Sequence, residues 1–331
     1  TTVGLLALLP MQALAGMTPE EVKAFKQYEA AAKQGDLVAQ NSLGLCYYFG
    51  RGVAKDYVQA VNLWRKGANQ GDAYAQHLLA HRYATGEGVA KDSVQAVNLW
   101  RKSADQGNAK AQFELGNSYA TGEGVAKNAV EAAKWYRKAA DQGDAAAQYN
   151  LGSSYHLGRG VAKDAVEAVK WYRKAADQGL ANAQFWLGVY YAAGNGVAKD
   201  QVQAVSWWRK AAVQGYDMAQ MALAECYANG NGVAKDQVQA VKWYRKGAEQ
   251  GNVGCLEQMG VYYANGLGVT KNLIEAYAYL SLAGITYEHA RQVLTAHEKM
   301  MSAVQIAAGK NRAIVLQKEI DAKKAAKQAG K

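Results

Sequence analysis

A repeat of 36 residues is the feature that most constrains the fold of this chain. The tetrapeptide Gly-Val-Ala-Lys recurs in register and a last copy reads Gly-Val-Thr-Lys, the first residues being Gly52, Gly88, Gly124, Gly160, Gly196, Gly232 and Gly268. A repeat of this length forms a stack of units, each packed on its neighbours, instead of one central core. Proline occurs only at Pro10 and Pro19, so helices inside the repeats are not interrupted. We therefore expect a single all-α domain.

The first half of each unit has the pattern of one helix. In the unit that begins at Gly143, the residues Ala147, Gln148, Leu151 and Gly152 share one helical face. A tyrosine follows, and then Gly-x-Gly-Val, in which glycine supplies backbone angles that other residues avoid. We expect this segment to be a turn.

The second half of each unit has the pattern of another helix, antiparallel to the first. It begins at Asp or Asn with Gln or Glu three residues later, as at Asp164 and Glu167, which predicts a capping box in every unit. The glycine that opens the next unit ends this helix. The stripe that we expect to be buried comprises Val166, Ala168, Trp171 and Ala175.

The tryptophans of the repeats are predicted to be packing residues. We assign one structural position to six of them, namely Trp64, Trp100, Trp135, Trp171, Trp207 and Trp243. Recurrence at one position favours a building element over a binding site. An Arg-Lys pair lies near the C-terminal end of each of these helices, where cations complement the helix dipole.

These residues resemble the Sel1-like repeat family, relatives of tetratricopeptide repeats. The family pattern A-x-x-x-L-G-x-x-Y-x-x-G-x-G-V-x-x-D-x-x-x-A-x-x-W-Y-R-K-A-A is matched almost residue by residue from Ala147 to Ala176. The resemblance implies a right-handed superhelical solenoid with the first helices on its concave side. It also implies adaptor or scaffold roles and, in bacteria, exported proteins that bind envelope or host partners or neutralise toxins.

The two ends of the chain are expected to cap the stack. Residues 18–34 begin with Thr18-Pro19-Glu20-Glu21 and align with a second helix, which predicts a capping half-repeat. Seven repeats then occupy residues 35–286. Residues 287–331 are predicted to form capping helices and a basic tail that frays from Asp321.

The charge of the chain is concentrated in that tail. The net charge is +10, and residues 299–331 contribute +6 of it, from eight Lys or Arg against two Asp or Glu. The groove positions hold few cations, so we expect no nucleic-acid partner. Weak contact of the tail with an anionic surface stays open as an alternative, although a lysine-rich end is usually only solvated.

The first residues suggest export. Val3–Leu14 is too short to span a bilayer, and Ala13-Leu14-Ala15 has the small-x-small pattern of a signal-peptidase site. We interpret residues 1–15 as a signal-peptide remnant, and expect a periplasmic or secreted protein with no transmembrane segment in the mature chain. The alternative is an apolar end of a cytosolic protein.

The three cysteines do not predict a disulfide framework. Cys46 and Cys226 occupy the same repeat position five repeats apart, and Cys226 and Cys255 are about 10 Å out of register by helical rise. Free structural thiols are expected. Some exported relatives of the family have cysteine-bridged repeats associated with β-lactam binding or hydrolysis, but their cysteines would fall near Ala68 and Gln76, so this branch is poorly supported.

No motif for catalysis, metal or cofactor is present in the sequence. His77 and His81 have the spacing of two metal ligands, but Leu78 stands where a His-Glu-x-x-His protease has its acid, and no third ligand is evident. We interpret both as solvated groove histidines. The chain is therefore expected to be non-enzymatic, with no cofactor.

Positions that vary between units are the candidates for partner binding, because scaffold positions repeat. On the first helices they predict an exposed ribbon of aromatic and methionine anchors with polar neighbours. The alternative is that these side chains pack on one another. The predicted concave-face residues are Tyr74, His77, His81, Phe113, Glu114, Asn117, Tyr149, Asn150, Phe185, Trp186 and Met221.

The favoured function is a non-enzymatic interaction module of the bacterial envelope that binds a protein or peptide on the concave face. An immunity-type protein that neutralises a toxin or effector in the periplasm is the alternative. A β-lactam-binding enzyme is a third, weaker hypothesis.

Overall fold

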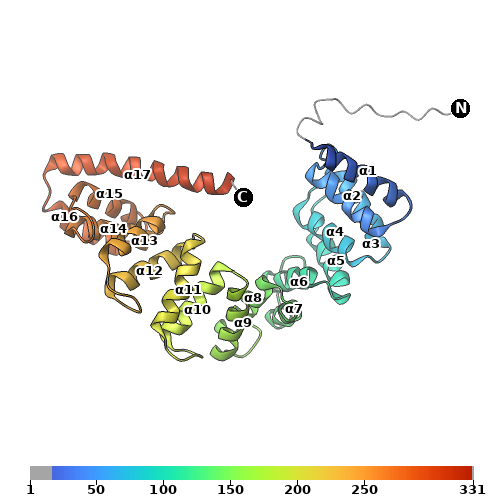
Figure 1. Ribbon diagram of the computed structural model, residues 1–331, viewed down its shortest axis with the longest axis horizontal. Helices are drawn as coiled ribbons and strands as arrows, with labels where there is room; N and C mark the ends of the chain where they lie inside the picture. The colour runs from blue at the N-terminus through green and yellow to red at the C-terminus, as the bar shows by residue number, and fades with distance from the viewer. Residues whose placement is uncertain (1–16, 330–331) are drawn as a thin grey trace. The chain divides into compact units, whose positions relative to one another are not determined.

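The computed structural model describes residues 17–329, and the regular structure in this range is entirely helical (Figure 1). The predicted all-α repeat fold is confirmed. The first helices of the pairs are α2 (Leu37–Phe49), α4 (Ala73–Thr85), α6 (Ala109–Thr121), α8 (Ala145–Leu157), α10 (Ala181–Ala193), α12 (Asp217–Asn229) and α14 (Val253–Asn265). The second helices are α3 (Tyr57–Asn69), α5 (Ser93–Asp105), α7 (Ala129–Asp141), α9 (Ala165–Asp177), α11 (Gln201–Val213), α13 (Gln237–Ala248) and α15 (Leu273–Gly284).

Three further helices lie outside these pairs. Helix α1 (Pro19–Lys33) precedes them, and α16 (Glu288–Glu298) and α17 (Ala303–Ala329) follow. The predicted signal-peptide remnant, residues 1–15, lies outside the described residues. Within the part of the chain that the structure describes, no helix is both long and apolar enough to cross a membrane.

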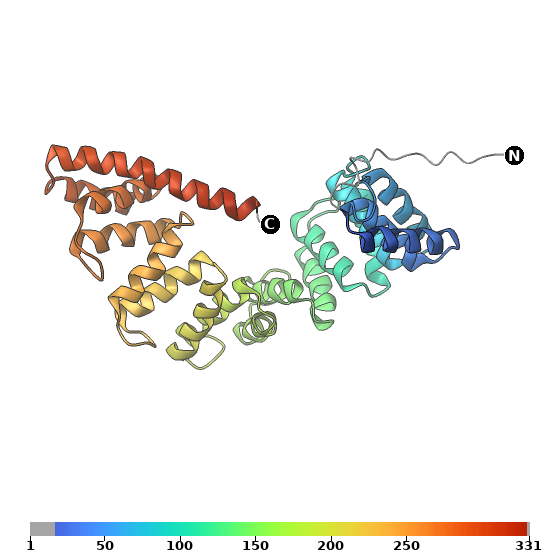
Figure 2. The same cartoon turned by 45° about the horizontal axis from the view of Figure 1, so that its top comes forward.

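The chain divides into two compact units between Lys163 and Asp164, here called the N-terminal and the C-terminal unit. In each unit the helices pack mostly in chain order, each against the next, except that α17 packs against α15 (Figure 2). Contacts between consecutive helices therefore place the same repeat positions side by side, and each unit is described by itself below.

The turn between the two helices of a pair depends on its glycines. Helix α8 ends at Gly158, whose φ of 69° is in the left-handed region that glycine tolerates best. Two residues later Gly160 lies against the start of α7, and a Cβ there would overlap the carbonyl oxygen of Ala129. The second glycine of the motif is thus required by a close backbone approach, since the turn of one pair packs on the second helix of the preceding pair.

The predicted capping boxes are half correct. The Asp56 side chain accepts a hydrogen bond from the backbone N–H of Gln59, as expected for an N-cap. The backbone N–H of Asp56, however, donates to the carbonyl of Tyr47 at 2.8 Å. The Gln59 side chain therefore does not accept from this N–H, so the second bond of a capping box is not formed. Full boxes are formed at α1, between Thr18 and Glu21, and before α17, between Ser302 and Gln305.

The buried face of the second helices differs from the predicted one. In α9 the buried residues are Ala168, Val169, Trp171, Tyr172, Ala175 and Ala176. The valine in the first turn of the second helix is instead exposed in six repeats, the residues being Val58, Val94, Val130, Val166, Val202 and Val238. At 100° per residue Val166 lies about 120° around α9 from the buried Tyr172, so the buried face does not include it.

The tryptophans occupy two adjacent repeat positions and not one. Trp64 and Trp100 lie one residue later in the unit than Trp135 and correspond to Tyr136. Both positions are buried against neighbouring helices. The indole N–H of Trp64 donates to the carbonyl of Asn41 at 3.3 Å, and that of Trp208, also at the later position, donates to the carbonyl of Phe185. The packing role is confirmed, and the single-position assignment is wrong.

The arginines of the Arg-Lys pairs link successive helix pairs. The arginine guanidinium donates to the tyrosine hydroxyl of the next pair, the partners being Arg101 with Tyr119, Arg137 with Tyr155, Arg173 with Tyr191, Arg209 with Tyr227 and Arg245 with Tyr263. The lysine lies 3.8–4.3 Å from the centre of a tryptophan ring, in Lys138 with Trp135, Lys174 with Trp171, Lys210 with Trp207 and Lys246 with Trp243. These bonds and cation–π contacts explain the pairs more directly than the helix dipole does.

The C-terminal helix covers the last pair and does not fray at Asp321. Leu316 and Ile320 of α17 are buried in the cluster that includes α15. The Lys323 ammonium lies 2.8 Å from the Glu249 carboxylate, and Lys327 donates to Gln250. Part of the basic tail is therefore used in contacts within the C-terminal unit, and the helix continues to Ala329.

The three cysteines are unpaired and buried. Burial raises the pKa of the Cys226 thiol to about 11 and that of Cys255 to about 12. Thiols with raised pKa values are poor nucleophiles at neutral pH, so they act as small apolar side chains in the core.

Candidate binding surface

A row of neighbouring polar side chains crosses three first helices of the N-terminal unit. It begins on α4, where the Nε2 of His81 lies 3.6 Å from a carboxylate oxygen of Glu114 on α6. The other oxygen of Glu114 accepts a hydrogen bond from the amide of Asn117, at 3.2 Å. The side chains of His81 and Glu114 are 33% and 25% exposed, so this row reaches solvent.

The row continues to α8. The Oδ1 of Asn117 accepts from the hydroxyl of Tyr136 at 2.8 Å and from the amide of Asn150 at 3.3 Å. Burial raises the pKa of Tyr136 to about 12, so its hydroxyl stays protonated and donates. We call His81, Glu114, Asn117 and Asn150 the polar row. All four were predicted as partner-binding residues, and the structure brings them together.

His77 lies beside the polar row but is buried, contrary to its interpretation as a solvated groove histidine. Its ring meets the ring of His81 edge-on, with centroids 4.8 Å apart. Burial, followed by the charges of His81, Lys110 and Arg82, lowers the pKa of His77 to about 4. Tyr74, stacked on the other side of His77 at 6.5 Å, is exposed. His77 therefore supports the surface, while Tyr74 is open to a partner.

The predicted aromatic ribbon is less exposed than expected. In the N-terminal unit, Phe113 and Tyr149 are both half-buried. The Phe113 ring lies 6.1 Å from that of Tyr136. These two side chains pack on neighbouring helices and show only part of their surface.

In the C-terminal unit the prediction of exposure is wrong for Phe185. This side chain is buried in a cluster with Trp208, whose indole N–H donates to the Phe185 carbonyl at 3.1 Å. Trp186 is half-buried and stacks on Tyr172, with centroids 6.3 Å apart. Met221 is also half-buried. The physical reason is the close approach of consecutive pairs, which turns this part of the first helices toward the next pair.

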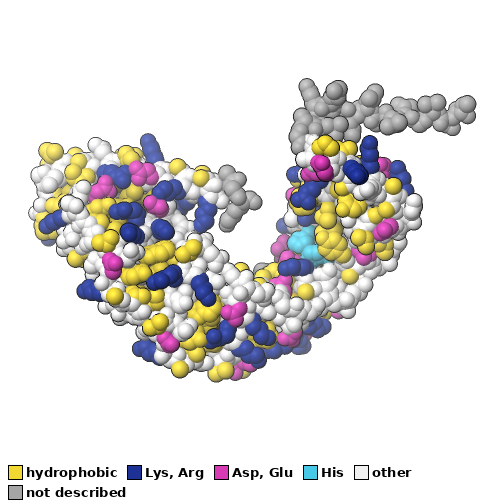
Figure 3. Space-filling model, in the orientation of Figure 1, with side chains coloured by type: hydrophobic (Ala, Val, Ile, Leu, Met, Phe, Trp, Pro, Cys, Tyr) yellow, Lys and Arg dark blue, Asp and Glu magenta, His cyan; other side chains and the backbone are white. Residues whose placement is uncertain are grey.

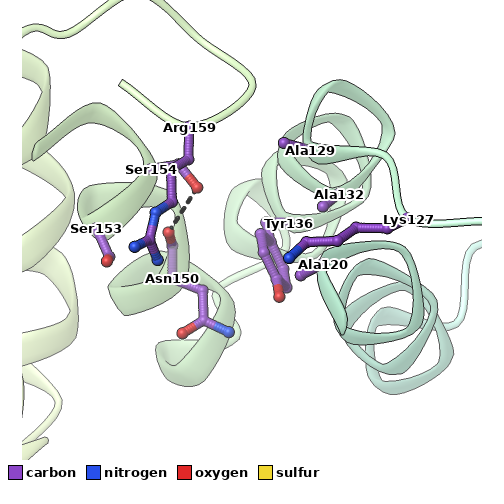
Figure 4. Close-up of a pocket in the computed structure, with 9 residues that line it drawn as sticks. All are labelled: Ala120, Lys127, Ala129, Ala132, Tyr136, Asn150, Ser153, Ser154 and Arg159. Atoms are coloured by element: carbon purple, nitrogen blue, oxygen red, sulfur yellow. Dashed lines mark hydrogen bonds between the residues drawn. The ribbon is translucent and has the colours of Figure 1, made fainter. Parts of the chain in front are cut away.

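A cavity of about 480 Å³ adjoins the polar row (Figure 4). Tyr136 and Asn150 line opposite sides of it. Lys127, which precedes α7, and Arg159, which follows α8, point toward it. The remaining lining residues are Ala120, Ala129, Ala132, Ser153 and Ser154. This volume is within the usual range of ligand pockets.

Sequence reasoning missed this cavity, although a signal for it exists. One repeat after Asn150 and Ser154 the sequence has Trp186 and Tyr190. The smaller residues of the N-terminal unit leave space where the next unit has aromatic rings. Figure 3 shows histidine side chains of the same unit beside acidic, basic and hydrophobic ones, so this face is mixed in character.

Comparison with known proteins identifies the repeat. The family model described as Sel1 repeat matches eight segments, 6–36, 37–72, 73–108, 109–144, 145–180, 181–216, 217–252 and 255–284. The chain belongs to the Sel1 repeat family. The first match overlaps the segment that the sequence predicts to be a capping half-repeat.

Solved Sel1 structures resemble this chain to different extents. A Sel1 repeat protein from Oxalobacter formigenes is 38% identical, with a TM-score of 0.66, over 74% of this chain and 96% of that one. The protective antigen c5321 of uropathogenic Escherichia coli, described as having an SLR fold, is 29% identical over 94% and 82%, with a TM-score of 0.45. The immunity protein Pa5087 of Pseudomonas aeruginosa is 22% identical over 70% and 83%, with a TM-score of 0.38. No curated protein matches the chain.

Sel1 repeats are protein-interaction modules, and the family is generally non-catalytic. No catalytic family matches this chain. Its expected partners are therefore proteins, while the particular surface that binds them has to be argued from the residues described above.

Proposed function

We propose that this Sel1 chain is a non-enzymatic interaction module that binds a protein or peptide through the polar row of its N-terminal unit. The observation that carries the proposal is the set of hydrogen bonds that joins Glu114, Asn117 and Asn150, with the His81 ring 3.6 Å from Glu114. Scaffold residues such as Gln112 and Gln148 repeat at their positions, but the residues of the row do not. Side chains that depart from the repeat and still reach solvent are free to serve a partner.

The row also has the physical properties of a binding surface. Its side chains are held by one another, so little rotamer entropy is lost when a partner adds further bonds. The exposed ring of Tyr74 lies at one end, and tyrosine is among the residues enriched at binding hot spots. A polar, partly exposed row next to a cavity suits a protein segment better than a flat apolar partner.

We further propose that the protein works in the bacterial envelope, in the periplasm or after secretion. This rests on the apolar segment Val3–Leu14 and the small residues Ala13 and Ala15 that follow the pattern of a signal-peptidase site. A reporter fused after residues 1–20, restored to a full start, should be exported. Reporter activity confined to the cytosol would overturn this assignment.

The binding proposal is tested by capture from envelope extract with matched variants. The wild-type chain is compared with the double variant Tyr74→Ala/Glu114→Ala and with the control Lys134→Ala/Lys170→Ala, which changes exposed lysines of second helices. We expect the same partner with wild type and control, and at least a tenfold lower yield with the double variant. Equal yields from all three would show that the partner binds elsewhere.

A further inference from the structure

The repeat supplies its own comparison for the cavity beside the polar row. In the C-terminal unit, Tyr172 is covered by the ring of Trp186, with centroids 6.3 Å apart and planes at 12°, and by Tyr190 at 5.9 Å. One repeat earlier, Tyr136 stands in place of Tyr172. The two covering aromatics are replaced there by an asparagine and a serine. The position that an aromatic ring fills in one unit is a cavity in the other.

The polar lining of the cavity is arranged on one side. The hydroxyl of Ser154 donates to the carbonyl of Asn150 at 2.9 Å, and the amide of Asn150 is held by Asn117. Tyr136 and the alanines of α6 and α7 supply the opposite, apolar side. The cavity thus combines an aromatic wall with a polar one.

Two cations complete the site. Lys127 and Arg159 are exposed and point toward the cavity (Figure 4). Among the described residues, neither has an ion-pair partner, whereas Lys91 and Lys110 of the same unit pair with Glu123 and Asp144. An unpaired arginine and lysine at the mouth of a pocket favour a carboxylate.

We propose that the cavity binds the aromatic residue at the carboxyl terminus of a protein partner. The ring of that residue packs against Tyr136, in the way that Trp186 packs against Tyr172 one repeat later. The terminal carboxylate pairs with Arg159 and Lys127. A terminal aromatic residue provides ring and carboxylate within the space of one residue. This inference rests on the proposed function and names the chemistry of the partner segment that the surface recognises.

The test is fluorescence anisotropy with three labelled peptides and the full chain. The probe is Gly-Ser-Gly-Ser-Phe with a free terminal carboxylate. The controls are the same peptide with a terminal amide and the peptide Gly-Ser-Gly-Ser-Ala with a free carboxylate. We expect the probe to bind at least tenfold more tightly than either control. Equal binding of the probe and either control would overturn the proposal.

Variants locate the binding in the cavity. The double variant Asn150→Trp/Ser154→Tyr gives this position the residues of the next repeat, and should lower the affinity for the probe more than tenfold while the helical circular dichroism is retained. Arg159→Ala changes an exposed side chain, so it keeps the fold and should lower affinity for the acid about fivefold but not for the amide. Lys163→Ala, at the position of Lys127 in the following repeat, should leave affinity unchanged.

The two proposals fail separately. If the probe binds no better than its controls and Arg159→Ala has no effect, the terminal aromatic residue is excluded as the ligand. Loss of partner capture by Tyr74→Ala/Glu114→Ala would still support binding at the polar row. If probe binding survives Arg159→Ala and the filling of the cavity, the peptide binds at another place and the inference is wrong.

Discussion

Trp186 stacks on Tyr172 at the repeat position where the N-terminal unit has Asn150 beside Tyr136. The same backbone is therefore closed by an aromatic ring in one unit and left open in the other. The difference comes from the side chains, because Asn150 and Ser154 stand where the next repeat has Trp186 and Tyr190. It gives the molecule a built-in control for each experiment on the cavity.

Replacing Trp186 by Ala should destabilise the C-terminal unit. Removal of a half-buried indole that stacks on Tyr172 leaves a cavity, at a cost of about 2 to 4 kcal/mol in the free energy of unfolding. Urea denaturation measures this change. The replacement Asn150→Ala at the equivalent position removes one hydrogen bond and should cost about 1 kcal/mol. A smaller loss of unfolding free energy for Trp186→Ala than for Asn150→Ala would mean that stacking of Trp186 on Tyr172 does not stabilise the unit.

Two glycines with similar backbone angles should respond differently to substitution. At Gly160 a Cβ would overlap the backbone of Ala129, whereas at Gly143 there is open space. Both have positive φ, so alanine costs about 1 kcal/mol at either position. Gly160→Ala should cost about 2 kcal/mol more than Gly143→Ala, because helix α7 has to move. Equal denaturation midpoints for the two variants would argue against the close approach of the turn.

The buried His77 should make stability depend on pH. Its pKa is lowered to about 4 in the folded state from an ordinary value of 6.5, so the unfolded chain binds the proton more readily. Its contribution to stability is complete above about pH 6.5 and is lost as pH falls toward 4, by about 2 to 3 kcal/mol. The neighbouring His81, whose pKa burial also lowers, acts in the same direction.

The measurement is the free energy of unfolding at several pH values between 7 and 4 for the wild type and for His77→Gln. Other groups titrate in both proteins, so the difference between the two curves isolates His77. The variant should lose less stability on acidification. Parallel curves would show that His77 is protonated as easily in the folded chain as in the unfolded one.

The repeat period, the two helices of each pair and their caps were predictable because they depend on local sequence. Glycine spacing and the Asp or Asn at each second helix fix the ends of helices through interactions within a few residues. The four residues of the polar row were also named from the sequence, since they depart from the repeat, but their contacts with one another were not predicted. These features need no knowledge of how one pair packs on the next.

Two of the failures concern burial. Val166 was expected inside and is exposed, and Phe185 was expected outside and is buried. Helical periodicity gives the order of residues around a helix, but the crossing of neighbouring helices decides which of them are covered. The cavity at Tyr136 was missed for the same reason, because its walls come from two successive pairs.

Site-specific photo-crosslinking is the most direct test of the central claim, that the first-helix face of the N-terminal unit contacts a protein partner. A photoreactive benzoylphenylalanine is placed at the exposed Tyr74, where it keeps an aromatic ring, in one variant and at the exposed Lys134 of a second helix in another, and the source cells are irradiated. We predict a discrete crosslinked protein with the first variant, absent from the second. A crosslinked product with Lys134 replaced, and none with Tyr74 replaced, would contradict the account.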